Sequence, residues 1–106
     1  MLRWRGVLRA QYAEIMGYEW LSHALAALGG IEPHEVMQAL HGTRRLPVPA
    51  TAESGARLLG IWSRTAAGKP LIVFLRHDGG LDWLIVGARE MKPDELATFE
   101  GWEARG

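Results

Sequence analysis

The sequence of 106 residues contains no cysteine, and this absence excludes disulfide bonds, thiolate metal sites and cysteine nucleophiles together. Long apolar runs are also missing. No run is longer than the stretch at residues 71–75, whereas a helix needs about 20 apolar residues to cross a bilayer. Residues 1–5 lack the apolar core of a secretory signal. We therefore expect a cytoplasmic protein that does not engage a membrane.

Length and composition indicate one globular domain over residues 1–106. A chain that is 48% hydrophobic and 23% charged is too apolar for intrinsic disorder. At 106 residues it is long enough to bury one core and too short for two. No internal repeat or low-complexity tract divides it.

The net charge is zero, unlike that of a typical nucleic-acid-binding protein, but the charges are unevenly distributed. Residues 44–89 carry seven basic and three acidic side chains, a local charge of +4. Residues 90–106 carry five acidic and two basic side chains, a local charge of −3. The excess of positive charge thus coincides with the strands expected below. Solvated acids on helix surfaces account for this distribution as well as a functional basic surface does.

The first half of the chain has the features of two helices. Residues 18–28 are rich in alanine and leucine, and their leucines fall on one helical stripe. The glycine pair that follows is expected to end this helix. A second helix is predicted to begin near Glu32 and Pro33, because proline favours the first turn, and to end at Gly42.

The second half changes to the segment length and turn signals of β-strands. Two connectors of hairpin length, each containing glycine, join three such segments. A proline-containing segment at 45–48 fits an edge strand. Proline followed by two acids at 93–95 is typical of a helix start. The three strands are expected at residues 57–65, 71–77 and 81–89.

Consecutive strands with helices grouped around them predict an α+β fold and not a doubly wound parallel sheet. The expected order is helix, helix, edge strand, three strands of an antiparallel meander, and a closing helix. Leu96, Phe99 and Trp102 are positioned to pack the closing helix on the sheet. Trp83 and Trp102 are assigned to the core, as is usual for tryptophan in a small domain.

Several common catalytic and cofactor motifs are missing. No glycine-rich nucleotide-binding motif is present. The serines have no recognisable nucleophile context. His34 and His41 lie seven residues apart, and no cysteine completes a metal-ligand set with them. We expect neither a cofactor nor a metal site.

Arginines on the expected strands are the most distinctive feature of the sequence. A guanidinium group stays charged and binds phosphate oxygens in a fork, so arginines on one sheet face would bind phosphates. The simpler explanation is that they are solvated or pair with acids across turns. Strand alternation alone does not decide between the two, because one bulge reverses it. Trp62 shares a strand face with one of these arginines and is the tryptophan best placed to stack on bases. The arginines are Arg57, Arg64, Arg76 and Arg89.

Three short strings, in their order and spacing, resemble the BrnT family of toxins within the broader RelE-like superfamily. The resemblance covers residues 18–104, which leaves residues 1–17 as an N-terminal extension. The first string opens with an acidic-Trp pair and a Gly-Ile hinge, the second matches a hairpin, and the third ends in a small-Ala-Arg signature and a closing helix. The matching residues are Glu19-Trp20, Ala24, Leu28, Gly30-Ile31 and Glu35-Val36; Arg57-Leu58-Leu59-Gly60 and Gly68-Lys69-Pro70-Leu71-Ile72-Val73; and Ile85-Val86-Gly87-Ala88-Arg89, Pro93, Glu95, Leu96 and Phe99-Glu100.

The resemblance implies a RelE-like fold, in which an antiparallel sheet of three to four strands has two or three N-terminal helices and one C-terminal helix. It further implies the toxin of a type II toxin–antitoxin system, a metal-independent ribonuclease that inhibits translation. A cognate antitoxin would neutralise the toxin and bind DNA, so that the toxin itself meets DNA only indirectly. The RNA target, free or on the ribosome, would be cut by attack of its own 2′-hydroxyl.

Residue roles follow from the same resemblance. Arg89 and Arg76 are expected to stabilise the phosphate, and His77 to transfer a proton. For RNA binding, the expected residues are Arg57, Arg64 and Trp62.

The chain also departs from the family pattern. A Lys-His pair often precedes the hinge in the family, and here Leu28 and Gly29 stand in its place. Together with the zero net charge, this supports an alternative, a non-catalytic interaction protein that retains the fold. Another interpretation takes residues 18–40 as a DNA-binding helix-turn-helix, but its second helix contains no Arg or Lys to meet phosphates.

Overall fold

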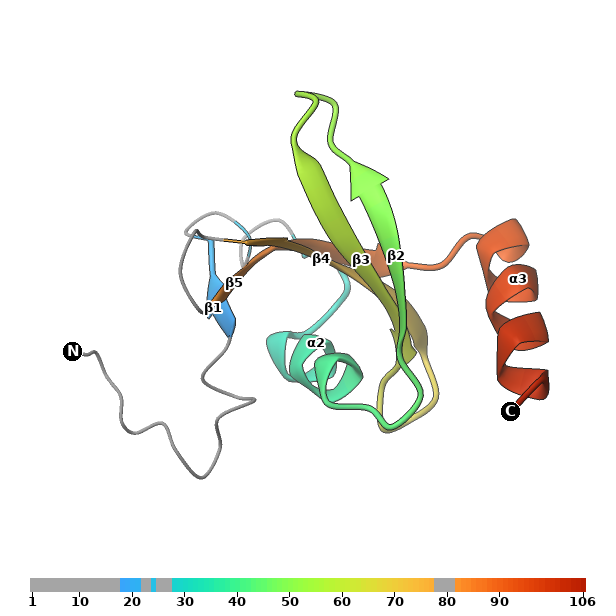
Figure 1. Cartoon of the computed structure of the whole chain (residues 1–106). Coiled ribbons are helices and arrows are strands. Elements are labelled where there is room, and N and C mark those ends of the chain that lie inside the picture. Colours follow the sequence, from blue (N-terminus) through green and yellow to red (C-terminus); the bar gives the residue numbers. More distant parts are fainter. Residues whose placement is uncertain (1–17, 22–23, 25–27, 78–81) are drawn as a thin grey trace.

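The computed structural model describes residues 18–21, 24, 28–77 and 82–106 and has an α+β architecture (Figure 1). The described part contains no helix that is both long and apolar enough to span a membrane. In chain order the elements are β1 (Tyr18–Trp20), α2 (Pro33–Leu40), β2 (Leu46–Thr51), β3 (Arg57–Arg64), β4 (Pro70–His77), β5 (Trp83–Glu90) and α3 (Pro93–Ala104).

The five strands form one open, mixed sheet in the order β1-β5-β4-β3-β2. The pairs β2–β3, β3–β4 and β4–β5 are antiparallel, so the expected meander is confirmed. The expected count of three to four antiparallel strands is wrong, because β1 adds a parallel edge strand along β5. Within the described residues one helix, α2, precedes β2 in place of the two or three expected.

The helix predicted over residues 18–28 is wrong at its start, where the chain forms β1. Tyr18 and Trp20 pair with β5, and the amide of Leu21 continues the pairing with a 3.0 Å hydrogen bond to the carbonyl of Ile85. Helix propensity is a weak preference that tertiary pairing overrides, and aromatic residues favour strands. Residues 22–23 and 25–27 of that prediction lie outside the described residues, as do residues 1–17 and 78–81.

Strand β2 is the edge strand that its prolines predict, and it extends to Thr51, beyond the expected 45–48. Pro47 and Pro49 are exposed and face positions 61 and 59 of β3. Proline cannot donate a hydrogen bond to a second neighbour, so a strand with two prolines is confined to an edge.

Helix α2 begins as expected, with proline in its first turn and Glu35 accepting a 2.9 Å hydrogen bond from the amide of Glu32. Its buried side chains, Val36, Ala39 and Leu40, pack into the curve of the sheet (Figure 1). We call the sheet surface that they cover the inner face. Its fully or largely buried side chains are Ile61, Leu71, Val73, Leu75 and Ile85.

Alternate residues of the central strands form the outer face of the sheet. In β4, the residues that alternate with Leu71, Val73 and Leu75 of the inner core point to the outer face. They are Ile72, Phe74 and Arg76. The register pairs Phe74 with Gly87 but Leu75 with Ile85, which leaves Val86 as an extra residue in β5. This bulge reverses the alternation of β5. Both Ile85 and Arg89 are odd-numbered, yet Ile85 faces the inner core and Arg89 faces outward opposite Ile72.

Helix α3 lies outside the curve of the sheet, on the side away from α2 (Figure 1). Phe99 is its one fully buried side chain, and the ring of Trp102 stacks on it at 5.5 Å between centroids. Trp102 is therefore half-buried on the outer side and does not join the main core. Trp83, also half-buried, packs against that core from its edge.

The inner core predicts a large effect for Leu71→Ala. Leu71 is fully buried, and its truncation is expected to lower the free energy of unfolding by about 2–5 kcal/mol, as measured by urea denaturation. Leu58→Ala, at a half-buried position of β3, is the matched control and should cost clearly less. Equal losses in both variants would contradict the placement of the core.

Candidate functional site: the outer face and its arginines

Three of the four strand arginines share the outer face. Arg89 stands opposite Ile72 in the β4–β5 ladder, and Trp62 stands opposite Ile72 in the β3–β4 ladder. Arg64 follows Trp62 by two residues, and Arg76 follows Ile72 by four, so both point to the same side. Arginines and aromatic rings on one surface can bind phosphates and stack on bases.

Arg89 is held by helix α3. Its Nη1 and Nη2 groups donate to the two oxygens of Glu95 at 2.7 and 2.8 Å, and its guanidinium lies 5.6 Å from the ring centroid of Phe74. The hydrogen bonds from Arg89 lower the pKa of Glu95 to about 2 and raise the pKa of Arg89. The expected phosphate-binding arginine therefore already holds a carboxylate in a fork.

Arg64 is held at the other end of the same helix. Its Nε and Nη2 groups each donate to Glu103 at 2.9 Å, and Nη1 donates to the carbonyl of Gly68 at 3.0 Å. Its guanidinium also lies 5.6 Å from the ring centroid of Phe99. The hydrogen bonds from Arg64 lower the pKa of Glu103. Arg64 and Arg89 thus fix both ends of α3 to the sheet.

Arg76 differs from these two arginines. It is exposed and makes no hydrogen bond or ion pair within the part of the chain that the structure describes. Four residues of strand separate it from Ile72, the cross-strand partner of Arg89, which corresponds to about 13 Å along β4. Of the three outer-face arginines, Arg76 is the one with a guanidinium open to a ligand.

His77 and Arg57 lie at the opposite side of the sheet. The His77 ring meets the edge of Trp83 at 4.9 Å between centroids, and both residues line a cavity of about 250 Å³ together with Arg57. Arg76 and His77 are neighbours in one strand and therefore point to opposite faces. The structure thus brings Arg57 to His77, but it does not bring the expected catalytic group of Arg89, Arg76 and His77 together.

A second cavity, of about 320 Å³, lies on the outer face and is mainly apolar. Leu21, Leu58, Phe74 and Val86 contribute its apolar lining, and Arg76 borders it. An apolar hollow beside an exposed guanidinium suits a partner that carries both apolar and acidic groups.

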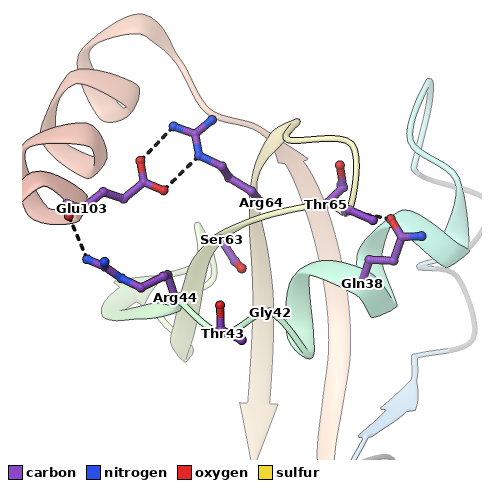
Figure 2. A pocket seen from close by; sticks show the side chains of 9 residues that line it. Gln38, Gly42, Thr43, Arg44, Ser63, Arg64, Thr65 and Glu103 are labelled. Atoms are coloured by element: carbon purple, nitrogen blue, oxygen red, sulfur yellow. Dashed lines mark hydrogen bonds and ion pairs between the residues drawn. The ribbon is translucent and has the colours of Figure 1, made fainter. Parts of the chain in front are cut away.

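A third cavity, of about 370 Å³, lies where α2, the end of β3 and α3 meet (Figure 2). Ser63 points into the space beside Gly42 and Thr43. Its hydroxyl is buried and has no hydrogen-bond partner among the residues that the structure describes, an arrangement that costs about 1–3 kcal/mol. Sequence reasoning missed this site because its residues come from three separate segments, 38–44, 63–66 and position 103, with no local motif. The lining residues are Gln38, Gly42, Thr43, Arg44, Ser63, Arg64, Thr65, Ala66 and Glu103.

No group of three or more His, Asp or Glu side chains in the described ranges is arranged to hold a metal ion. A scan against models of protein families finds no match for this chain, and the comparison with curated proteins finds none either.

The Arg89–Glu95 pair predicts a defined dependence of stability on acidity. The folded-state pKa of Glu95, about 2, lies below the unfolded value, which is about 4.3. The pair therefore stabilises the fold fully above the unfolded pKa, and this contribution is lost as the pH falls towards about 2. Glu95→Gln is expected to lower the free energy of unfolding by about 1 kcal/mol at neutral pH.

The measurement is urea denaturation at a series of pH values from neutral to strongly acidic. Glu95→Gln should lose less stability than the wild type across the acidic window. Glu90→Gln, the same chemical change at an exposed position without an ion pair in the described part, is the control. If Glu95→Gln and the wild type lose stability in parallel, the pair does not anchor α3.

Proposed function

We propose that the chain is the toxin component of a type II toxin–antitoxin pair and acts on RNA as a metal-independent ribonuclease that inhibits translation. The observation that carries this proposal is the cross-strand register, which sets Arg64, Arg76 and Arg89 on one sheet face with Trp62 and Phe74. The family resemblance of the sequence supplies the activity and the partner.

On this surface, guanidinium groups bind phosphates, and the exposed edges of aromatic rings meet bases. Arg76 makes the first phosphate contact because its guanidinium has no partner in the described residues. Arg64 and Arg89 contribute when phosphate oxygens replace the carboxylates of Glu103 and Glu95, which occupy the same forked geometry.

Strand scission then needs positioning and charge stabilisation more than a metal. The RNA 2′-hydroxyl gives up its proton to solvent and attacks the adjacent phosphorus atom to form a 2′,3′-cyclic phosphate. The bond to the 5′-oxygen of the next nucleotide breaks, and that oxygen takes up a proton from solvent. Arg76 stabilises the negative charge that builds on the phosphate oxygens. His77 takes part only if the RNA passes around the strand end, because its side chain lies on the inner face with Arg57.

The antitoxin, in this proposal, covers the outer face. Its apolar side chains fill the hollow around Leu58, Phe74 and Val86, and its acidic groups pair with Arg76. Bound there, it blocks the phosphate contact directly. The toxin then meets DNA only through this partner.

A specific observation favours a second candidate, a non-catalytic interaction protein. The forked pairs with Glu95 and Glu103 already neutralise Arg89 and Arg64, and the apolar hollow remains open. Such a protein would bind its partner through that hollow and leave RNA intact. RNA cleavage by the purified chain above the rate in buffer alone distinguishes the toxin from this alternative.

Arg76→Ala is the sharpest test of the proposed function. Arg89→Ala would also remove the pair with Glu95 and disturb α3, whereas Arg76 holds no described part of the fold in place. Induced expression of the wild type should arrest growth and degrade RNA, and Arg76→Ala should do neither while retaining its melting temperature. Arg105→Ala makes the same charge change at the exposed end of α3 and should remain toxic.

Arrest by Arg76→Ala at the wild-type level would contradict the role of Arg76. If growth stops while the RNA stays intact, the chain is a toxin, but its proposed ribonuclease activity is excluded.

RNA binding by the wild type should weaken steeply with salt, because each phosphate contact releases counterions. Arg76→Ala should reduce the slope of log affinity against log salt by about 1. Filter binding or fluorescence anisotropy with a short RNA, over a range of salt concentrations, provides the measurement. An unchanged slope would show that Arg76 does not touch phosphate.

A further inference from the structure

The cavity of about 370 Å³ between α2, β3 and α3 is separate from the phosphate contact assigned to Arg76 (Figure 2). It opens between the C-terminal end of α2 and the C-terminal end of α3, and Ser63 lies at its base. Ser63 is 1% exposed. A Cβ atom on Gly42 would lie 2.8 Å from the Ser63 Oγ, so any larger residue at this position would crowd that hydroxyl.

The cavity is rich in unused hydrogen-bond donors. The Gln38 Oε1 accepts from the amide of Ala66 at 3.0 Å, which leaves the amide N–H groups of Gln38 without a partner among the described residues. The Ser63 hydroxyl has no partner at all in that set. Of the Arg44 nitrogens, only Nη2 donates to a described residue, and its acceptors are the carbonyls of Trp102 and Glu103 at the end of α3.

The balance of charge in the cavity is positive. Two guanidinium groups and one carboxylate line it, and Arg64 takes the carboxylate of Glu103 in its fork. Arg44 is left without a carboxylate partner in the described part of the chain and lies 4.8 Å from the ring centroid of Trp102. Among the lining side chains, one positive charge is thus in excess beside hydroxyl and amide donors, a combination that favours an oxyanion. Glu100, whose carboxylate lies 3.8 Å from Arg64, does not line the cavity.

We propose that this cavity binds a phosphate monoester group through Arg44, Ser63 and Gln38. The phosphate supplies the acceptors that these donors lack, and its charge balances the guanidinium of Arg44. The volume is in the range of small-molecule sites, which fits a phosphate that is carried on a nucleoside or on a nucleic-acid end. This site does not depend on ribonuclease activity and would be present in the non-catalytic alternative as well.

The test is titration of the full-length chain, followed by NMR or calorimetry, with inorganic phosphate, adenosine 5′-monophosphate and adenosine. Both phosphate compounds should bind saturably, and adenosine should not. Arg44→Gln and Ser63→Ala are each expected to weaken binding by at least about tenfold, the effect of one charge-assisted hydrogen bond. A short RNA with and without a terminal phosphate then distinguishes a nucleic-acid end from a free nucleotide as the source of the phosphate.

Two controls separate binding from structure. Ser63→Ala removes an unpaired buried hydroxyl, so its melting temperature without ligand should equal or exceed that of the wild type. Arg105→Gln lowers the charge by the same amount as Arg44→Gln, at a position that does not line the cavity, and should bind phosphate normally. Absence of binding by the wild type, normal binding by Ser63→Ala, equal binding of adenosine, or equal weakening by Arg105→Gln would each overturn the proposal.

Discussion

Two forked ion pairs connect the C-terminal helix to the sheet, and much of the molecule's surface chemistry depends on them. Arg89 holds Glu95 at the start of α3, and Arg64 holds Glu103 near its end. Between the two pairs, Phe99 is the helix's one fully buried side chain. The two pairs thus fix the position and direction of α3 against β3 and β5. The contact of Phe99 alone would not fix the direction of the helix axis.

In these pairs, Arg64 and Arg89 hold α3 on the sheet, and this structural role competes with the binding of phosphate by the same guanidinium groups. A guanidinium group binds carboxylate and phosphate oxygens in the same forked geometry. The carboxylates of α3 therefore occupy the positions on Arg64 and Arg89 that phosphate oxygens of RNA would take. RNA can recruit these two arginines only at the cost of the helix contacts, whereas Arg76 lies outside this competition. A neutral surface in the isolated chain is therefore compatible with phosphate binding at the sheet, provided that the ligand repays the loss of the α3 contacts.

Much of the fold could be predicted from local signals, because those signals coincide with the tertiary structure. Proline followed by acids predicts the start of α3, and the glycine-containing connectors predict the antiparallel meander. Pro47 and Pro49 predict that β2 is an edge strand. Two features depend on long-range pairing and could not be predicted. Strand β1 forms because β5 offers an edge to Tyr18–Trp20. The bulge at Val86 has Gly87 beside it as its sequence signal, but a glycine in a strand does not fix the pairing that decides the face on which Arg89 lies.

The same bulge explains the charge pattern of the sequence. The basic segment 44–89 and the acidic segment 90–106 suggested either solvated helix acids or an open basic surface. The structure supports neither in its simple form, because the two segments neutralise each other across the α3 contact through Glu95 and Glu103. Had β5 paired regularly through Val86, without the bulge, simple alternation from Ile85 would have turned Arg89 to the inner face and left Glu95 without its partner. The bulged pairing of β5 therefore places Arg89 on the face where α3 docks, beside the exposed Arg76 of β4.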